Sequence, residues 1–191
     1  SRTFWNILGE HHITSTVLRV PITFPPEKFN GRMLSAMCTP DLLGTQGTFA
    51  LFTTRKEKGY MESGNRFPLS EKDGAWNGQI EGPRNAMVEG GGAMHIGFVL
   101  QPTGENKAIL TIGDERHELV EGEYTPWITL SFEAALGIKV RGVARFLLTE
   151  TQPELSLYIT PINIDPEDPA LPISRPSYYA TYLAKLLGVY S

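Results

Sequence analysis

The sequence is poor in cysteine, contains no long apolar run and carries no large excess of charge. Cys38 is the only cysteine among 191 residues, which excludes an internal disulfide and a cysteine-based zinc site. No run approaches the roughly 18 apolar residues that a membrane helix needs, so no membrane span is expected. The net charge of −4 gives no general attraction to nucleic acid, and no nucleic-acid partner is expected.

Apolar and polar residues alternate through most of the chain between residues 48 and 160. Period-two alternation is typical of strands with one buried face. Turn-forming spacers such as EGGG, GDE and TQPE separate the alternating runs, and no helical pattern intervenes. The pattern predicts a mainly β protein, with an antiparallel β-sandwich or barrel-like domain over 48–160. The clearest runs are TFALFTT, AMHIGFVLQ, KAILTIG and IKVRGVARFLL.

The two ends of the chain have a different pattern. Residues 1–47 contain a short helix near Phe4, an apolar strand over 13–20 that we expect to be buried on both faces, and a proline-rich loop over 21–31. Residues 161–191 form a proline-rich linker and a return helix that stops at Gly188. We therefore predict a β domain inserted into an α/β core, and we interpret the chain as an internal segment of a longer protein. The expected apolar stripe of the return helix is Tyr179, Tyr182, Leu183, Leu186 and Leu187.

Two groups of residues are candidates for ligand contact. In open α/β sheets, ligands bind at the carboxyl ends of the strands, so the loop over 21–31 is expected to border a substrate cleft. A basic stripe over 138–148 suits an anion, or else forms a solvated face with carboxylates opposite. The candidates are Thr23, Glu27, Lys28 and Arg32 for the cleft, and Lys139, Arg141 and Arg145 for the stripe.

The remaining reactive side chains are isolated in the sequence. Cys38 is interpreted as a buried structural thiol. Glu115 and His117 are expected to share a strand face, and the simplest interpretation is a solvated sheet edge. Asp41 lies in TPDLLGTQGT, ahead of Gly44, and this pattern indicates an acceptor for backbone N–H groups in a turn.

Four runs carry a family resemblance that covers nearly the whole chain. They are TFWNILGEHHITSTVLRVPITFPP, NGRMLSAMCTPDLLGTQGTF, GIKVRGVARFLL and LYITPINIDPEDPALPIS. With these runs the sequence resembles the type I phosphodiesterase/nucleotide pyrophosphatase branch of the alkaline-phosphatase superfamily, in particular a bacterial subgroup. The resemblance implies an α/β core, two divalent metal ions (usually zinc), and a Thr or Ser nucleophile that attacks phosphorus.

The metal ligands of that family do not transfer to this chain. TPDLLGT matches the Pro-Asp-x-x-Gly-His ligand motif only as far as Gly44, and Thr45 stands where the motif has histidine. We therefore assign no catalytic residue, metal ligand or cofactor here, and the two metal ions are expected in the rest of the parent. The expected role is to shape or cover the parent's substrate cleft for a phosphoester. Both a periplasmic or extracytoplasmic and a cytoplasmic location are compatible with the sequence.

Two other functions are compatible with the same residues. A β-sandwich with exposed Trp76 and Trp127 suits a non-catalytic module that binds a carbohydrate or a lipid headgroup. An insert of this kind also suits a purely structural or dimerisation role.

Overall fold

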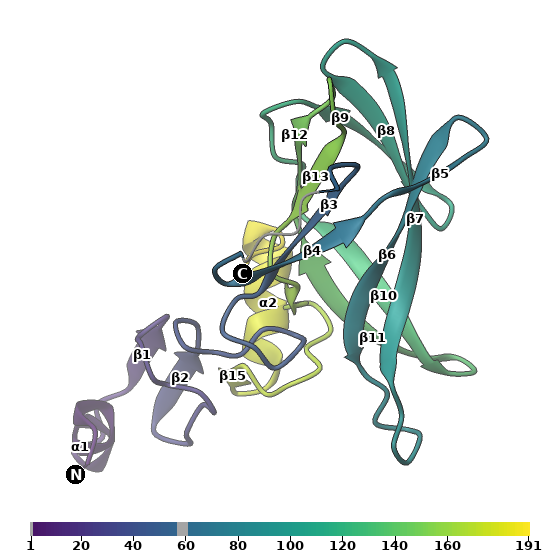
Figure 1. Cartoon of the computed structure of the whole chain (residues 1–191). Coiled ribbons are helices and arrows are strands. Elements are labelled where there is room, and N and C mark those ends of the chain that lie inside the picture. Colours follow the sequence, from purple (N-terminus) through teal and green to yellow (C-terminus); the bar gives the residue numbers. More distant parts are fainter. Residues whose placement is uncertain (1, 57–60) are drawn as a thin grey trace. The chain divides into compact units, whose positions relative to one another are not determined.

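The chain divides into two compact units, of which the first is discontinuous in sequence (Figure 1). The computed structural model describes residues 2–56 and 61–191, and its secondary structure is 46% strand and 9% helix. Unit 1 comprises Ser1–Pro40 and Ile164–Ser191, and unit 2 comprises Asp41–Asn163. Unit 2 is thus inserted between the two segments of unit 1. The boundaries expected from the sequence, 47/48 and 160/161, lie just inside unit 2.

Unit 1 combines two helices with a small mixed sheet. The strand order is β1-β2-β15, in which β1 and β2 are parallel and β15 is antiparallel to β2. Trp5, Val17 and Met33 form its apolar core. The elements are α1 (Phe4–Glu10), β1 (Ser15–Leu18), β2 (Gly31–Leu34), β15 (Ser174–Arg175) and α2 (Tyr178–Leu187).

Unit 1 is less buried than the sequence predicts. The prediction that the first strand is buried on both faces is wrong, because Val17 is its only buried residue and the Leu18 side chain is 51% exposed. The predicted apolar stripe of α2 is buried at Tyr179, but Tyr182, Leu186 and Leu187 are exposed. The helix also buries Ala180 and Ala184.

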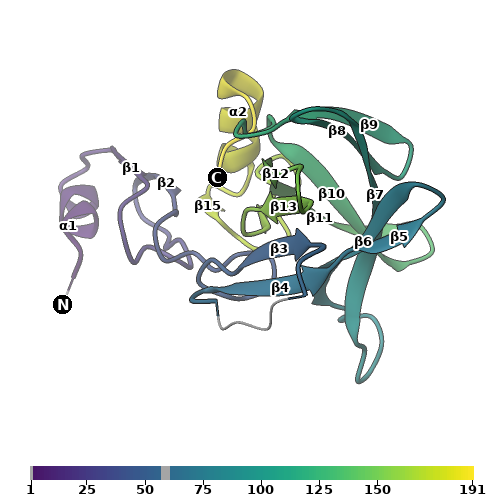
Figure 2. The ribbon, with the colours of Figure 1, turned by 45° about the horizontal axis from the view of Figure 1, so that its top comes forward.

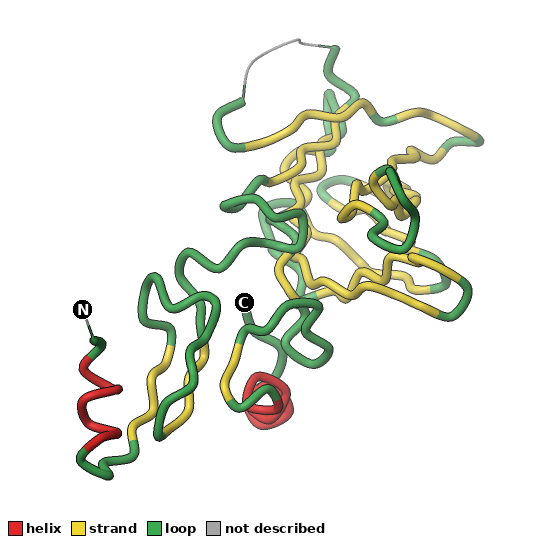
Figure 3. The backbone as a smooth tube through the Cα atoms, turned by 90° about the horizontal axis from the view of Figure 1, so that it is seen from below, coloured by secondary structure: helices red, strands yellow, loops and turns green. Residues whose placement is uncertain are grey.

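Unit 2 contains strands and loops but no helix among its described residues (Figure 3). Its sheets have the orders β12-β13-β3-β4, β5-β6-β7-β8-β9 and β10-β11-β14 (Figure 2). This confirms the predicted mainly β, sandwich-like fold, although the sheets do not close into a barrel. The strands are β3 (Phe49–Thr53), β4 (Gly64–Pro68), β5 (Ser70–Lys72), β6 (Ala75–Arg84), β7 (Ala93–Gly104), β8 (Lys107–Ile112), β9 (Glu115–Val120), β10 (Ile128–Ala135), β11 (Ile138–Ala144), β12 (Phe146–Glu150), β13 (Ser156–Ile159) and β14 (Asn163–Ile164).

One pairing in unit 2 departs from the antiparallel prediction. Strands β3 and β4 are parallel, with Phe49 opposite Gly64 and Thr53 opposite Pro68. The ladders β10–β11, β12–β13, β13–β3 and those of the sheet β5-β6-β7-β8-β9 are antiparallel. Alternation in the sequence specifies which face of a strand is buried, but it contains no information on the direction of the neighbouring strand.

The inner faces of the three sheets pack through phenylalanine rings. The ring of Phe132 in β10 covers Gly82 in β6, so that a Cβ atom added to this glycine would lie 2.2 Å from Cδ1 of the ring. Phe52 in β3 meets Phe98 in β7 edge-on, with ring centroids 4.9 Å apart. All three rings are buried. These contacts connect the three sheets through a single close-packed core.

The Phe132 contact predicts that Gly82→Ala destabilises the protein. The added methyl group overlaps a fully buried ring, and overpacking of this kind costs about 1–3 kcal/mol. Gly97→Ala in β7 is the matched control, because its Cβ atom meets nothing within 4 Å. The control is expected to be neutral or slightly stabilising, since alanine loses less backbone entropy on folding. Urea unfolding followed by tryptophan fluorescence measures both, and equal midpoints would contradict the packing argument.

Candidate functional site

The four residues predicted to border a cleft in unit 1 lie in different environments. Thr23 is buried, and its hydroxyl donates to the Val20 carbonyl at 2.7 Å. Lys28 and Arg32 are exposed. The Arg32 guanidinium lies 6.0 Å from the ring centroid of Tyr179. Thr23 therefore stabilises the turn after β1, whereas Lys28 and Arg32 are accessible to a ligand.

Glu27 is held by side chains from the first helix. Its carboxylate accepts hydrogen bonds from the Trp5 indole, from Thr3 Oγ1 at 3.0 Å and from Asn6 Nδ2 at 3.0 Å. Burial raises the pKa of this carboxyl, but the hydrogen bonds from Trp5, Asn6 and Thr3 together outweigh burial, so that the pKa lies below its usual value. Glu27 thus fixes the proline-rich loop to α1.

The predicted basic stripe is divided between two elements. Lys139 and Arg141 lie on the same face of β11, and Lys139 is opposite Glu133 of β10 in the register. Arg145 is not on this strand, because β11 ends at Ala144 and β12 begins after Arg145. The prediction of one continuous strand through this stretch is therefore wrong.

Arg145 instead lies against aromatic rings. Its Nε donates to the Thr125 carbonyl at 2.7 Å, and its guanidinium carbon lies 5.3 Å and 5.8 Å from the ring centroids of Tyr124 and Trp127. Cation–π contacts of this kind fix the arginine as well as the rings. Neither Trp127 nor Trp76 is exposed as predicted: both are half-buried. Trp127 therefore has a structural partner, and Trp76 lies on the inner side of β6.

The histidines do not converge on one point. His11 and His12 follow α1 and are exposed, and His95 lies on the outer face of β7. His117 and Glu115 share a face of the edge strand β9, with Nε2 of His117 3.5 Å from Oε2 of Glu115, as the sequence predicted. In the described part of the chain, no group of three or more histidine, cysteine, aspartate or glutamate residues is placed to hold a metal ion.

Cys38 is exposed, so the prediction of a buried thiol is wrong. It lies in a turn after β2 and has a φ angle of 70°, in the left-handed region.

Asp41 is the acceptor of a buried turn at the start of unit 2. Its side chain is 5% exposed. Oδ1 accepts from the backbone N–H groups of Leu43 at 3.0 Å and Thr45 at 2.8 Å. Oδ2 accepts from the Thr45 hydroxyl and from the backbone N–H of Gly47 at 3.3 Å. Gly44 and Gly47 have φ angles of 78° and 104°, which allow the loop to wrap around the carboxylate. The predicted turn-acceptor role is confirmed.

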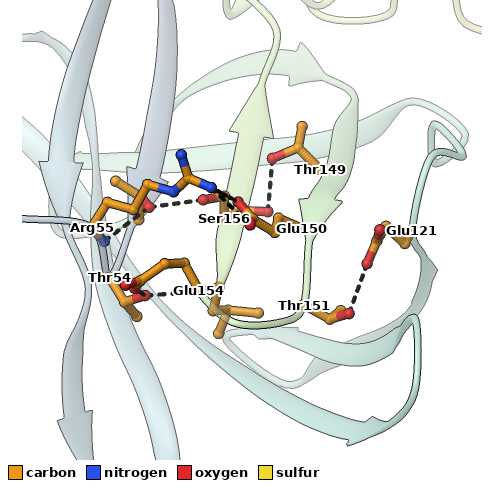
Figure 4. A network of polar contacts seen from close by, with 10 residues as sticks. Thr54, Arg55, Glu121, Thr149, Glu150, Thr151, Glu154 and Ser156 are labelled. Carbon is orange, nitrogen blue, oxygen red and sulfur yellow. Dashed lines mark hydrogen bonds and ion pairs between the residues drawn. The ribbon is translucent and has the colours of Figure 1, made fainter. Parts of the chain in front are cut away.

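A polar network connects β3 to the hairpin of β12 and β13 (Figure 4). Nη2 of Arg55 donates to both carboxylate oxygens of Glu150, at 2.8 and 2.7 Å. The hydroxyls of Thr53 and Ser156 are 2.8 Å apart and buried. Most of these groups are engaged with one another, so we interpret the network as structural.

A large opening in unit 2 lies over the outer face of β6 and β7. It is an open cavity of about 690 Å³, which also borders β4, β5 and β8. The cross-strand register aligns Gln79 with Gly97, and Glu81 with His95, on this face. Thr111 of β8 extends the same surface, opposite Val99. Sequence reasoning missed this site, because its residues come from strands that alternation alone does not order.

Several side chains of this face are free to bind a ligand. The polar atoms of Gln79, Glu81 and His95 make no side-chain hydrogen bond or ion pair with any residue in the ranges 2–56 and 61–191. Gly97 leaves the centre of the face without a side chain. A second cavity of about 490 Å³ shares Phe67 and Glu81 with the first. The face is thus polar and accessible, and it adjoins a further hollow.

Comparisons with known proteins do not assign the chain to a family. No family model, curated protein or solved structure matches the chain. No helix of the described residues is long and apolar enough to cross a membrane.

The Asp41 turn predicts that both oxygens of its carboxylate are needed. Asp41→Asn places an NH₂ group against one pair of donors, and Asp41→Ala leaves four donors without their acceptor. A buried donor without a partner costs about 1–3 kcal/mol, so we expect a loss in this range for asparagine and a larger loss for alanine. Urea unfolding of both variants gives the two values. A midpoint unchanged in Asp41→Ala would show that the turn does not depend on the carboxylate.

The lowered pKa of Glu27 predicts acid-sensitive anchoring of the loop over 21–31. Because the folded pKa lies below the unfolded value, the stabilisation is present above about pH 5 and declines as the pH falls through the folded pKa. The difference in unfolding free energy between the wild type and Glu27→Gln should therefore shrink on acidification. The indole proton of Trp5, followed by NMR, should shift over the same range. A difference independent of pH would contradict the assignment.

Proposed function

We propose that this chain is an internal part of a metal-dependent phosphodiesterase or nucleotide pyrophosphatase-like hydrolase of the alkaline-phosphatase superfamily. In this proposal unit 2 shapes or covers the substrate cleft and takes no part in breaking the bond. The observation that carries the proposal is topological. Unit 2 is continuous and lies between the two sequence segments of unit 1, as an inserted domain does in the architecture that the resemblance implies.

The order and pairing of the secondary-structure elements in unit 1 support its assignment to an α/β core. A helix precedes β1, and β1 pairs in parallel with β2, and parallel strands are a feature of α/β cores. The loop between these strands starts at the carboxyl end of β1, the edge at which such sheets bind ligands. Of the four residues predicted to border the cleft, Lys28 and Arg32 are the two positively charged ones, and both are exposed.

The surface of unit 1 supports a further protein layer against it. Large apolar side chains are exposed on both of its sequence segments, including Ile22 at 83% and Leu187 at 73%. We take these exposed apolar side chains as support for a surface that another protein layer covers. We assign this layer to the rest of the parent α/β domain, which supplies the nucleophile and the ligands of two divalent metal ions.

In this proposal the rest of the parent protein carries out the reaction on the substrate. The metal ions of the superfamily activate the nucleophile and stabilise the leaving oxygen, and no residue of this chain is assigned to that task. Lys139 and Arg141 are the residues of unit 2 proposed for contact with an anionic group of the phosphoester. Arg145 is excluded from this role because Tyr124, Trp127 and Thr125 already hold it.

The test is the activity of the complete protein encoded by the reading frame that contains these residues. We expect zinc- or manganese-dependent hydrolysis of bis(p-nitrophenyl) phosphate. A variant with a short glycine-serine linker in place of residues 41–163 should retain hydrolysis of this small substrate and show an altered KM for larger phosphodiesters. The linker can be short, because the Leu42 N–H donates to the Ile162 carbonyl at 2.7 Å.

Two results decide between the proposal and its alternatives. A complete protein without metal-dependent phosphodiesterase activity would overturn the proposal. The present 191-residue chain, assayed with the same metals, is expected to give no turnover above background. Turnover that disappears in Asp41→Asn would place the active site inside unit 2, contrary to the proposal.

A further inference from the structure

We infer that the outer face of β6 and β7 is a binding site for an uncharged oligosaccharide. The inference concerns unit 2 alone and does not depend on the hydrolase proposal. It rests on the cavity of about 690 Å³ above Gln79, Gly97 and Thr111. A cavity of this size falls in the range that accommodates small-molecule ligands.

The polar groups of the cavity match hydroxyl groups better than an anionic ligand. Amides and hydroxyls both donate and accept hydrogen bonds, as sugar hydroxyls do. The amide and hydroxyl side chains in the lining are Ser70, Asn77, Gln79 and Thr111. No lysine or arginine is among the described residues that line this cavity, whereas Glu81 places a carboxylate there. Phosphate and other anions are therefore disfavoured.

The floor and wall of the cavity suit the apolar faces of a sugar ring. Gly97 provides a flat floor, since a Cβ atom there would have no neighbour within 4 Å. The Phe67 ring forms part of the wall and is fixed by stacking on buried Phe52, with centroids 5.0 Å apart. An aromatic ring beside polar groups provides both the apolar surface and the hydrogen bonds that sugars require. This face replaces Trp76 and Trp127 as the binding surface.

The second cavity indicates an oligomeric ligand. Phe67 and Glu81 line both cavities, so a chain of sugar units that passes Glu81 reaches Asn65, Arg84 and Thr160. These residues supply further donors and acceptors along the same path. A single sugar unit would occupy only one of the two hollows, and an oligosaccharide is therefore the better match.

The test is an NMR titration of the full 191-residue chain with neutral hexasaccharides. The probes are cellohexaose, xylohexaose, mannohexaose and maltohexaose, and inorganic phosphate is the charged comparison. We expect at least one hexasaccharide to shift the backbone amides of Gln79, Gly97 and Thr111, while phosphate leaves them unchanged. Shifts caused by phosphate alone, or by none of the probes, would overturn the inference.

Two variants locate the site. Gly97→Val fills the floor at a position where an added Cβ atom meets nothing within 4 Å, and it is expected to abolish binding. Gly104→Val is the matched control, because it is on the same strand, has equally open space and lies outside the cavity lining. Gln79→Ala should weaken binding about tenfold, as expected for the loss of a hydrogen bond. Equal affinities for Gly97→Val and Gly104→Val would refute a site on this face.

Discussion

The carboxylate of Asp41 determines how unit 2 begins. It satisfies four donors in a loop of seven residues, and three of these donors are backbone N–H groups. Immediately after it, the Leu42 N–H donates to the carbonyl of Ile162, near the end of the same unit. The loop that this carboxylate holds therefore sets the direction in which the first strand of unit 2 enters its sheet.

The same carboxylate explains why a motif that resembles a metal ligand has a structural role here. Each of its oxygens already accepts two hydrogen bonds, so little capacity remains for a metal.

Much of the fold could be predicted because it depends on local pattern. Alternation identified the strands around Phe98, Leu110 and Leu157, and all three of these side chains are buried, whereas in β3 the buried side chain is Phe52 and not the predicted Phe49 and Leu51. Glycine and aspartate identified the turn at Asp41, since the hydrogen bonds of that turn span only a few residues. Where local and tertiary preferences agree, a single sequence is sufficient to specify the element.

The remaining features depend on contacts between distant residues. The parallel direction of β3 and β4 and the division of the stretch 138–148 at Arg145 are set by neighbours that alternation does not identify. The sequence indicated that Glu27 belongs to a loop, but not that Trp5 would engage its carboxylate. The face around Gly97 was missed for the same reason: glycine within a strand lowers the apparent periodicity, although here it creates the floor of the cavity.

The hydrogen bond between Leu42 and Ile162 has a consequence for the way such a chain can arise. The two ends of unit 2 lie next to each other. Once unit 2 has folded, it therefore joins the two segments of unit 1 as a tight connection would, and not as a long flexible loop. The entropic cost of closing this long loop is then part of the folding free energy of unit 2 and is not added to that of unit 1. A β unit of this form can be gained, exchanged or circularly permuted during evolution with little effect on the stability of the sheet that carries it.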